Sequence, residues 1–495
     1  MKVLGTASRH QIFFVGILLT YLILATGTAI TRQPYSDEGY LASPAYTLVH
    51  RGYMAVIPSD QHRDSHKAYW MPPVFFLVQA AWQSVVGFGV VQFRLGSVVA
   101  GLVLLFAIHY VVSRLSDDRT LALIIMSLVA LDYTFVQHAG IGRPEMMSSA
   151  FAVCSLAAHL ALRQRYLGLA LLASHALMAT SALTHPIGAL LWMPALLGLQ
   201  AYLDLKQLRL TSLLLIALPY LVGGAAWSLY ILDDPNEFRS QLSGMALGSN
   251  RFAGLQDPFR AVPREVVDRF LGYYGVRPNA SFLVKLKLVL PVGYVMGILA
   301  ALVVPVARRS RFVRMALLLS LVQFLTLAVF EGTKQYHYIL HIIPAFLGVL
   351  GAVLWLGWQH AWIPRVMLAA VAFMLMLAQV GPTVFRFSEN RYYHDFLPVL
   401  DYIRPYAQQG DLILSESEFA IPLGFPDNLV ADESYGFKRP VRPKLVVADL
   451  TVYESNKNGA KKRRPQLYEY LNEDFPGEFE AVFRGGNYTV YRRRE

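Results

Sequence analysis

Residues 11–42 read "QIFFVGILLTYLILATGTAITRQPYSDEGYLA" and join a membrane-spanning pattern to two adjacent carboxylates, Asp37 and Glu38. The first part, 11–30, is uncharged and has about the 20 residues that a helix needs to cross the hydrocarbon core of a bilayer. It is longer than the apolar core of a signal peptide, and no convincing A-x-A cleavage site follows it. The sequence therefore predicts a retained first span whose end carries two acids.

The composition extends this pattern to the whole chain. Hydrophobic residues make up 55% of the 495 residues, charged residues only 16%, and the mean hydropathy is +0.40. These values exceed what a soluble core of this size would use, and they predict a polytopic α-helical membrane protein. The net charge of +11 is assigned to the loops between spans and not to nucleic-acid binding. The single cysteine, Cys154, excludes an intrachain disulfide.

About eleven apolar runs have a length suited to a transmembrane helix. A further segment at 72–91 is shorter in its apolar part, contains two glutamines and begins with two prolines. The eleven predicted spans lie at 11–30, 93–113, 119–137, 145–162, 167–184, 186–203, 211–231, 284–306, 312–331, 337–358 and 362–382.

The basic residues predict the orientation. If the segment 72–91 does not cross and the N-terminus is cytoplasmic, nearly every short basic loop, including "RRSRFVR" at 308–314, lies inside. If the segment crosses, the later loops exchange sides and the positive-inside rule fails repeatedly. We therefore predict that 72–91 is an interfacial or re-entrant helix on the outer side.

Two domains are expected. Residues 1–382 form the transmembrane domain, with outer loops at 31–92 and 232–283, and residues 383–495 form a small extracytoplasmic α/β domain. In that domain "DLILSES", "PKLVVADL", "EAVFRGG" and "YTVYRR" have the pattern of strands, whereas "NKNGAKKRRP" at 456–465 is typical of a solvated basic loop.

With this topology, a set of ionisable residues gathers at the outer ends of the spans. An ionisable side chain near hydrocarbon costs on the order of 3 kcal/mol, so such groups usually face a polar cavity or one another. The pattern predicts a polar site on the outer face. The set consists of Asp37, Glu38, Arg143, Glu145, His185, Lys334, His337 and His341.

Each motif also has a structural explanation. Asp37 and Glu38 could simply complement the dipole of a short helix that Ser36 caps, and Arg143 and Glu145 could form a plain ion pair. In "EGTKQYHYILHIIP" (331–344), a cation with imidazole and phenol groups suits an anionic lipid headgroup, but equally an interfacial anchor.

Metal binding has weak support in the sequence. Histidines of the outer loops leave a divalent metal open as an alternative, but their spacing is not diagnostic, and no cofactor is predicted. No phosphate-binding glycine-rich loop, nucleophile elbow or CxxC motif is present. The loop histidines are His50, His62 and His66.

Five motifs together resemble the GT-C superfamily of membrane glycosyltransferases, in particular the bacterial branch related to protein O-mannosyltransferases and the lipid A aminoarabinose transferase. The resemblance covers most of residues 30–360 and depends on the order of the motifs. They are "YSDEGYLA", "MPPVFFLVQAAWQSVVGFGVVQFRLGSVVAGL", "GRPEMMSSAFAV", "LTHPIGALLWMPAL" and "KQYHYILHIIPAFLGVLG".

The resemblance implies roles for the residues that match. The acid of the first outer loop is catalytic in the family, which assigns the general base to Asp37 with Glu38 beside it. The basic and aromatic cluster before a late span binds the carrier phosphate, and it matches Lys334, Tyr336 and His337. The arginine-proline-acid motif implies a role in shaping the site, with Glu145 as a catalytic candidate and Arg143 as a phosphate candidate, and His185 is a further candidate.

One departure concerns the residues before the double proline. Many relatives have lysine there, and the aminoarabinose-type enzymes have an adjacent glutamate that binds metal, whereas this sequence has Met71 and Trp70. Lys67, His66 or Arg63 could supply the missing phosphate contact instead.

The function implied is inverting transfer of a hexosyl or pentosyl group from a polyprenyl-phosphate donor to a hydroxyl of a glycolipid, lipid A, a glycan or a protein, at a bacterial inner membrane. No nucleotide would be needed. The alternatives are a lipid or glycan transporter, an O-antigen-ligase-like transferase that uses pyrophosphate-linked donors, and a receptor. A transporter should place its polar site nearer the midplane of the membrane.

Overall fold

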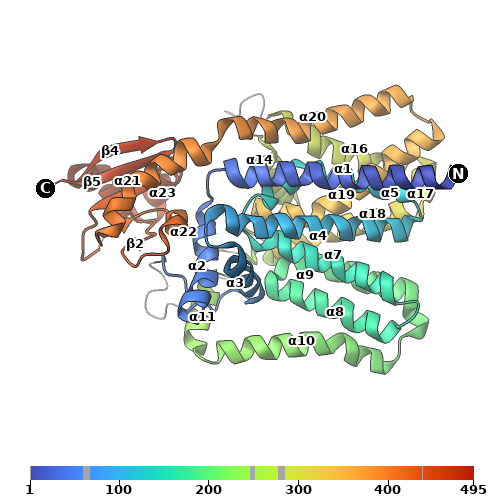
Figure 1. Cartoon of the computed structure of the whole chain (residues 1–495), viewed down its shortest axis with the longest axis horizontal. Coiled ribbons are helices and arrows are strands. Elements are labelled where there is room, and N and C mark those ends of the chain that lie inside the picture. Colours follow the sequence, from blue (N-terminus) through green and yellow to red (C-terminus); the bar gives the residue numbers. More distant parts are fainter. Residues whose placement is uncertain (1, 60–66, 246–250, 277–284, 438, 495) are drawn as a thin grey trace.

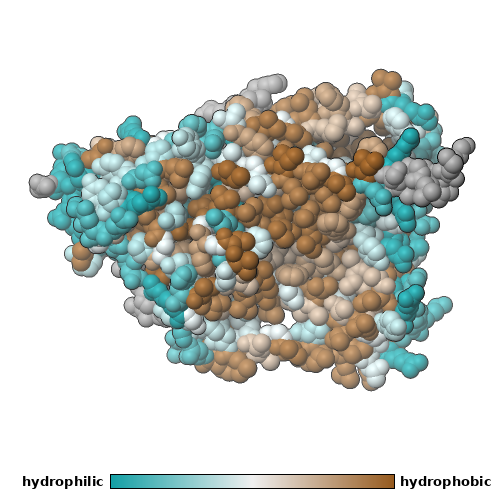
Figure 2. Space-filling view, in the orientation of Figure 1, coloured by the Kyte–Doolittle hydropathy of each residue, from teal (hydrophilic) through white to brown (hydrophobic). Residues whose placement is uncertain are grey.

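The structure, a computed structural model, describes residues 2–59, 67–245, 251–276, 285–437 and 439–494. It is a bundle of long helices with a small α/β domain at one end and the N-terminus at the other (Figure 1). Hydrophobic residues cover the middle of the visible face, and hydrophilic residues gather at both ends (Figure 2). This is the distribution that a bilayer requires, and the chain is a multi-pass membrane protein.

Nine helices among the described residues are long and apolar enough to cross a membrane. The pair α5 (Arg119–Leu131) and α6 (Tyr133–Ala139) is long and apolar enough only when taken together, and it is bent by 61°, as in a broken span or a re-entrant loop. The predicted eleventh span, at 284–306, contains the shorter helix α16 (Val289–Val303). The nine are α1 (Lys2–Thr31), α4 (Val90–Ser116), α7 (Pro144–Leu162), α8 (Leu167–Thr184), α9 (Pro186–Asp204), α10 (Leu210–Ile231), α18 (Arg311–Phe330), α19 (Ile339–His360) and α20 (Arg365–Glu389).

The first loop forms two short helices, α2 (Ser36–Arg51) and α3 (Val74–Val86), which pack against each other. At 1.5 Å per residue, the 13 residues of α3 reach about 20 Å, too short for a hydrocarbon core of about 30 Å. Both helices lie at the end of the bundle that carries the α/β domain (Figure 1). The segment 72–91 is therefore a short helix of the loop, as predicted.

The second loop, between α10 and α16, packs against the ends of the later spans. Short helices form most of its described part, and two of their charged side chains, Glu265 and Arg269, are buried. These helices are α11 (Pro235–Ser243), α12 (Ala253–Gln256), α13 (Pro258–Arg264), the π-helix η4 (Glu265–Leu271) and α14 (Gly272–Tyr274). Short connecting helices elsewhere are η2 (Leu205–Gln207), α17 (Pro305–Arg309), η5 (Tyr336–Tyr338) and η6 (Tyr392–Phe396).

The C-terminal domain contains a five-stranded mixed sheet with strand order β2-β1-β3-β5-β4. The pairs β1–β2 and β1–β3 are parallel, whereas β3–β5 and β4–β5 are antiparallel. The strands are β1 (Ile413–Leu414), β2 (Leu429–Val430), β3 (Leu445–Asp449), β4 (Phe479–Gly485) and β5 (Tyr488–Arg493). The helices are α21 (Leu397–Gln408), η7 (Ser417–Phe419), α22 (Ala420–Leu423), α23 (Leu450–Arg463), α24 (Pro465–Glu469), η8 (Tyr470–Asp474) and α25 (Phe475–Glu478).

Two local features of this domain differ from the sequence-based expectation. The four predicted strand segments all contain strands, but the two-residue β2 was not predicted. Most of 456–465, expected as a loop, belongs to α23, because Asp449 caps that helix through the backbone N–H groups of Thr451 and Val452 and because Ala460 is buried. The predicted boundary at 382/383 falls inside α20.

The C-terminal domain packs directly on the first loop. The Oγ of Ser417 donates a hydrogen bond to the carbonyl of Ser36, and the backbone N–H of Ala431 donates to the carbonyl of Pro58 at 2.7 Å. A Cβ at Gly39 would lie 2.0 Å from the carbonyl oxygen of Ser417, so only glycine fits there. The domain thus holds the helix that carries Asp37.

Candidate active site

Asp37 lies in the first turn of α2, and its side chain is 43% exposed. The Nη1 of Arg143 forms an ion pair with its Oδ2. Asp37 also lines a small cavity, of about 90 Å³, between α2 and the C-terminal domain. A carboxylate that is oriented by a guanidinium and still open to solvent can accept a proton from a bound molecule.

Glu38, its neighbour, is fully buried. Its two oxygens accept hydrogen bonds from Nε and Nη2 of Arg94 at 2.7 and 2.6 Å, and from the backbone N–H groups of Gly142 and Tyr35 at 2.8 and 2.7 Å. Burial by itself raises the pKa of Glu38, but Arg94 and the backbone donors lower it below its usual value. Glu38 is therefore an ionised carboxylate whose contacts all hold the fold together.

Arg94 was not predicted as part of the site. It sits in the first turns of α4, where an arginine beside hydrocarbon requires a polar partner, and this was the signal available in the sequence. Besides Glu38, it donates to the carbonyls of Ala29 and Arg32 at 2.8 and 2.9 Å. Arg94 thereby joins the ends of α1, α2 and α4.

Arg143 connects Asp37 to Glu145. Its Nη2 lies 2.7 Å from Oε1 of Glu145, which occupies the first turn of α7 and is buried. The guanidinium also stacks on Tyr35, with Cζ 5.7 Å from the ring centroid. Arg143 carries one positive charge between two carboxylates, so the cluster keeps a net negative charge beside the open face of Asp37.

An imidazole and phenol cluster adjoins Tyr35. The Nε2 of His337 lies 3.3 Å from Oη of Tyr35, and its ring lies 3.9 Å from that of Tyr336. His185, at the turn between α8 and α9, packs on Tyr338 at 5.4 Å. Burial lowers the pKa of His185 to about 4, which keeps the imidazole neutral. Among the described residues, Nδ1 of His185 and of His337 have no hydrogen-bond partner, although both are buried.

Lys334 occupies a different environment. Its Nζ lies 3.0 Å from Oε2 of Glu265 and donates to the carbonyl of Ala328 at 2.6 Å. Arg269 pairs with the same Glu265 at 2.5 Å and with Glu331 at 2.7 Å. All four charged side chains are buried and balance one another. Lys334 thus joins the second loop to the end of α18.

The remaining predicted residues lie apart from Asp37. Lys67 pairs with Asp233, which also accepts a hydrogen bond from Tyr69 at 3.0 Å. His50 stacks on Tyr46 at 4.1 Å. No group of three or more histidine, cysteine or carboxylate residues in the described ranges could hold a metal ion. His62, Arg63 and His66 lie outside the described residues.

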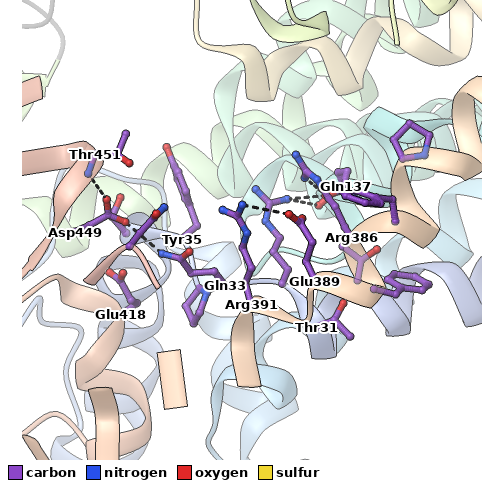
Figure 3. Close-up of a pocket in the computed structure, with 18 of the residues that line it drawn as sticks. Thr31, Gln33, Tyr35, Gln137, Arg386, Glu389, Arg391, Glu418, Asp449 and Thr451 are labelled. Carbon is purple, nitrogen blue, oxygen red and sulfur yellow. Dashed lines mark hydrogen bonds and ion pairs between the residues drawn. The ribbon is translucent and has the colours of Figure 1, made fainter. Parts of the chain in front are cut away.

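A larger cavity, of about 690 Å³, lies between the ends of α1 and α20 and the C-terminal domain. Figure 3 shows Arg386 and Gln137 at one end and Asp449, Thr451 and Glu418 at the other, with Tyr35 between them. Ser36 and Glu416 line both this cavity and the small cavity that contains Asp37, so the two cavities share this part of their walls.

Known proteins with a similar fold were found only among solved structures. No family model and no curated protein sequence matches the chain. Among solved structures, ArnT from Cupriavidus metallidurans bound to undecaprenyl phosphate is similar, with a TM-score of 0.58 and 15% identity over 97% of both chains. The Archaeoglobus fulgidus oligosaccharyltransferase in complex with Zn and sulfate matches with a TM-score of 0.51 and 11% identity, over 92% of this chain and 71% of that one.

These likenesses define the fold. The chain has the fold of the GT-C membrane glycosyltransferases, and the resemblance predicted from the five motifs is confirmed at the level of the fold. In particular, the first ArnT structure and its apo form, which has a TM-score of 0.57, cover nearly the whole chain, including the C-terminal domain.

Proposed function

We propose that this protein is a glycosyltransferase that moves a hexosyl or pentosyl group from a polyprenyl-phosphate donor to a hydroxyl of a glycolipid, glycan or protein. The observation that carries the proposal is Asp37, a carboxylate that opens on a cavity while Arg143, paired with the buried Glu145, orients it. The fold supports it, because a similar protein, ArnT, binds undecaprenyl phosphate.

In the proposed reaction, the acceptor hydroxyl gives its proton to Oδ1 or Oδ2 of Asp37 as its oxygen attacks the anomeric carbon. The bond from that carbon to the phosphate oxygen breaks, and the polyprenyl phosphate leaves as an anion. Because the leaving group is already acidic, no general acid is needed, in contrast to the two-carboxylate glycosidases. One displacement inverts the anomeric configuration.

Arg143 and Glu145 act as positioning residues in this scheme. Arg143 fixes Asp37 by an ion pair, and Glu145 fixes Arg143 from the opposite side. Glu38 acts one step further away, because it holds the turn at Gly142 against the start of α2. Preorganised charge of this kind lowers the cost of reaching the transition state.

The departing phosphate has several candidate partners. Tyr336 and His337 lie beside Tyr35, which stacks on Arg143. The buried Nδ1 atoms of His337 and His185 have no partner among the described residues, and each could hydrogen-bond a ligand oxygen that reached it. Lys334 remains a proposed phosphate contact, and this role requires its ion pair with Glu265 to open. Lys67 and His66 are proposed only for the outer part of the donor site.

We further propose that Asp37 and the C-terminal domain face outward from a bacterial inner membrane, with the N-terminus in the cytoplasm. The support is the positive-inside pattern, because the basic loop at 308–314 and the N-terminus belong to the end of the bundle opposite the C-terminal domain (Figure 1). A cysteine introduced at the exposed Arg404 should react with an impermeant maleimide on intact cells, and protection until lysis would contradict the orientation.

The function is tested with the purified full-length protein and a panel of polyprenyl-phosphate sugars, incubated with lipid and glycan extracts as acceptors. The proposal expects one donor to be consumed with release of polyprenyl phosphate, and no consumption by Asp37→Asn. Exclusive use of pyrophosphate-linked donors would instead support the ligase-like alternative. Consumption at a normal rate by Asp37→Asn would remove the assignment of the base.

A further inference from the structure

The larger cavity has a strongly basic end. Arg386 donates a hydrogen bond from Nη1 to Oε1 of Gln137 at 2.6 Å, and Nη1 of Arg32 donates to the same oxygen at 3.3 Å. Lys287 and Arg386 both lie over the ring of Tyr133, at 4.8 and 5.3 Å from its centroid. Three cations from three separate segments of the chain therefore meet at one wall of the cavity.

The two arginines at this wall lack a negative partner. Among the described residues, neither Arg32 nor Arg386 forms an ion pair with a carboxylate, and together they share one neutral amide oxygen. Burial and, next, the charge of Arg386 lower the pKa of Arg32. Both arginines are partly buried, and like charges this close are unfavourable unless an anion neutralises them. A phosphate can accept hydrogen bonds from several guanidinium N–H groups at once.

The opposite end of the cavity is acidic and belongs to the C-terminal domain. Glu418 is 2% exposed, accepts a hydrogen bond from Tyr488 at 2.8 Å on Oε1, and has no partner for Oε2 among the described residues. Asp449 accepts from Gln33 at 3.2 Å and caps α23. A buried carboxyl oxygen without a partner, at the wall of a cavity, suits a hydroxyl donor from a ligand.

We propose that this cavity is the acceptor site, and that it takes an anionic, hydroxyl-rich saccharide. Arg32, Arg386 and Lys287 bind a phosphate or equivalent anionic group of the acceptor, and Glu416 and Glu418 bind its hydroxyl groups. The inference rests on the proposed function and gives the C-terminal domain a role in recognising the acceptor. The volume of about 690 Å³ lies within the usual range of small-molecule sites, about 300–1,000 Å³.

The position of Asp37 favours the acceptor over the donor as the occupant. In the proposed reaction, the donor phosphate is attached to the reacting carbon, so it must lie beside Asp37 and Arg143. Arg386 and Glu418 lie at opposite ends of the cavity (Figure 3), whereas Glu416, of the C-terminal domain, also lines the small cavity of Asp37. A hydroxyl held at the acidic end therefore lies next to the base.

The test measures binding to the purified full-length protein in detergent micelles. The probes are N-acetylglucosamine 1-phosphate, uncharged N-acetylglucosamine and undecaprenyl phosphate. The sugar phosphate should bind at least about tenfold more tightly than the sugar, since one charge-assisted contact is worth about 1.4 kcal/mol or more. Arg386→Ala should remove that advantage and leave the affinity for undecaprenyl phosphate unchanged, which also shows that the variant is folded.

A second variant changes an exposed residue. Thr451 is exposed and lines the cavity at its acidic end, so Thr451→Trp should block the site by its size and weaken binding of the sugar phosphate by about tenfold or more. The matched control is Arg404→Ala, which removes an exposed arginine of the same domain that pairs with Asp401 and should change nothing.

Three results would overturn the inference. They are equal binding of the charged and uncharged sugars, unchanged binding in both cavity variants, and an Arg386→Ala defect confined to undecaprenyl phosphate, which would assign the basic end to the carrier lipid. The binding measurement does not depend on whether Asp37 is the general base. Asp37→Asn keeps the shape of the side chain and should bind the sugar phosphate as the wild type does. Transfer by Asp37→Asn would contradict the proposed function and leave this binding result intact.

Discussion

Two charged clusters lie at the same end of the bundle and differ in what they leave open. Around Asp37, one arginine serves two carboxylates, Asp37 is 43% exposed and a cavity adjoins it. Around Lys334, two cations balance Glu265 and Glu331, and all four side chains are buried. A cluster with unbalanced charge and an exposed member is equipped for chemistry, whereas a balanced, buried cluster holds segments together.

The largest expected effect is on the open cluster. Asp37→Asn keeps the shape of the side chain and removes its basicity, so transfer should fall by about 100- to 10,000-fold, the usual contribution of a general base. Thermal unfolding in detergent should change little, because the side chain is half-exposed. The matched control is Asp233→Asn, an exposed acid at the same end that pairs with Lys67, and it should retain most of the transfer activity.

The balanced cluster should respond in the opposite way. Arg269→Leu leaves Glu331 buried without its partner, and removing one member of a buried ion pair typically costs about 3–5 kcal/mol of stability. The thermal midpoint should fall strongly, while transfer per folded molecule should be largely kept. Arg264→Leu, which removes an exposed ion pair of the same loop, should shift the midpoint only slightly. A large loss of transfer without loss of stability would mean that the cluster takes part in the reaction.

Lys334 belongs to the buried cluster and is also a proposed contact of the donor phosphate. If it contacts the donor phosphate, Lys334→Ala should raise the donor KM by about tenfold, the cost of one charge-assisted contact. Glu265→Gln weakens the same ion pair but keeps the ammonium group, so its donor KM should stay near that of the wild type. Unchanged donor saturation in Lys334→Ala would assign this lysine to the buried cluster alone.

The smallest effect concerns pH and the C-terminal domain. Burial and the charge of Asp449 raise the pKa of Glu416 from 4.5 to about 7. Between these values the folded state holds a proton that the unfolded chain has lost, so stability should decrease as the pH rises through this window and reach its lower level above about pH 7.

Hydrogen exchange of β3 amides in the full-length protein, corrected for the intrinsic effect of pH, measures this change. Glu416→Gln cannot ionise and should flatten the profile, whereas Asp401→Asn, an exposed acid of the same domain, should follow the wild type. A profile that is equally steep in Glu416→Gln would exclude Glu416 as its source.

Apolar runs, the distribution of basic residues and strand patterns sufficed to predict the bundle, the short helix at 72–91 and the C-terminal α/β domain with four of its strands. These features depend on local composition and on the bilayer, which acts on each segment separately. The same reasoning predicted that one end of the bundle carries Asp37, Arg143, Glu145 and His337.

The environments of individual residues could not be predicted, because they depend on partners far away in the sequence. Glu38 pairs with Arg94, and Lys334 pairs with Glu265. Neither pairing produces a repeating pattern in the sequence from which it could have been predicted. The cavity between α20 and the C-terminal domain, with Arg386 and Glu418 at its two ends, likewise arises only when the domain packs on the bundle.

The anomeric configuration of the product, determined by NMR with the donor that the panel identifies, tests most directly whether transfer occurs in one step with Asp37 as its base. A single displacement assisted by one carboxylate must give inversion relative to the polyprenyl-phosphate sugar. Retention would contradict the mechanism, because it would require a carboxylate such as Asp37 to attack the sugar itself and form a covalent intermediate.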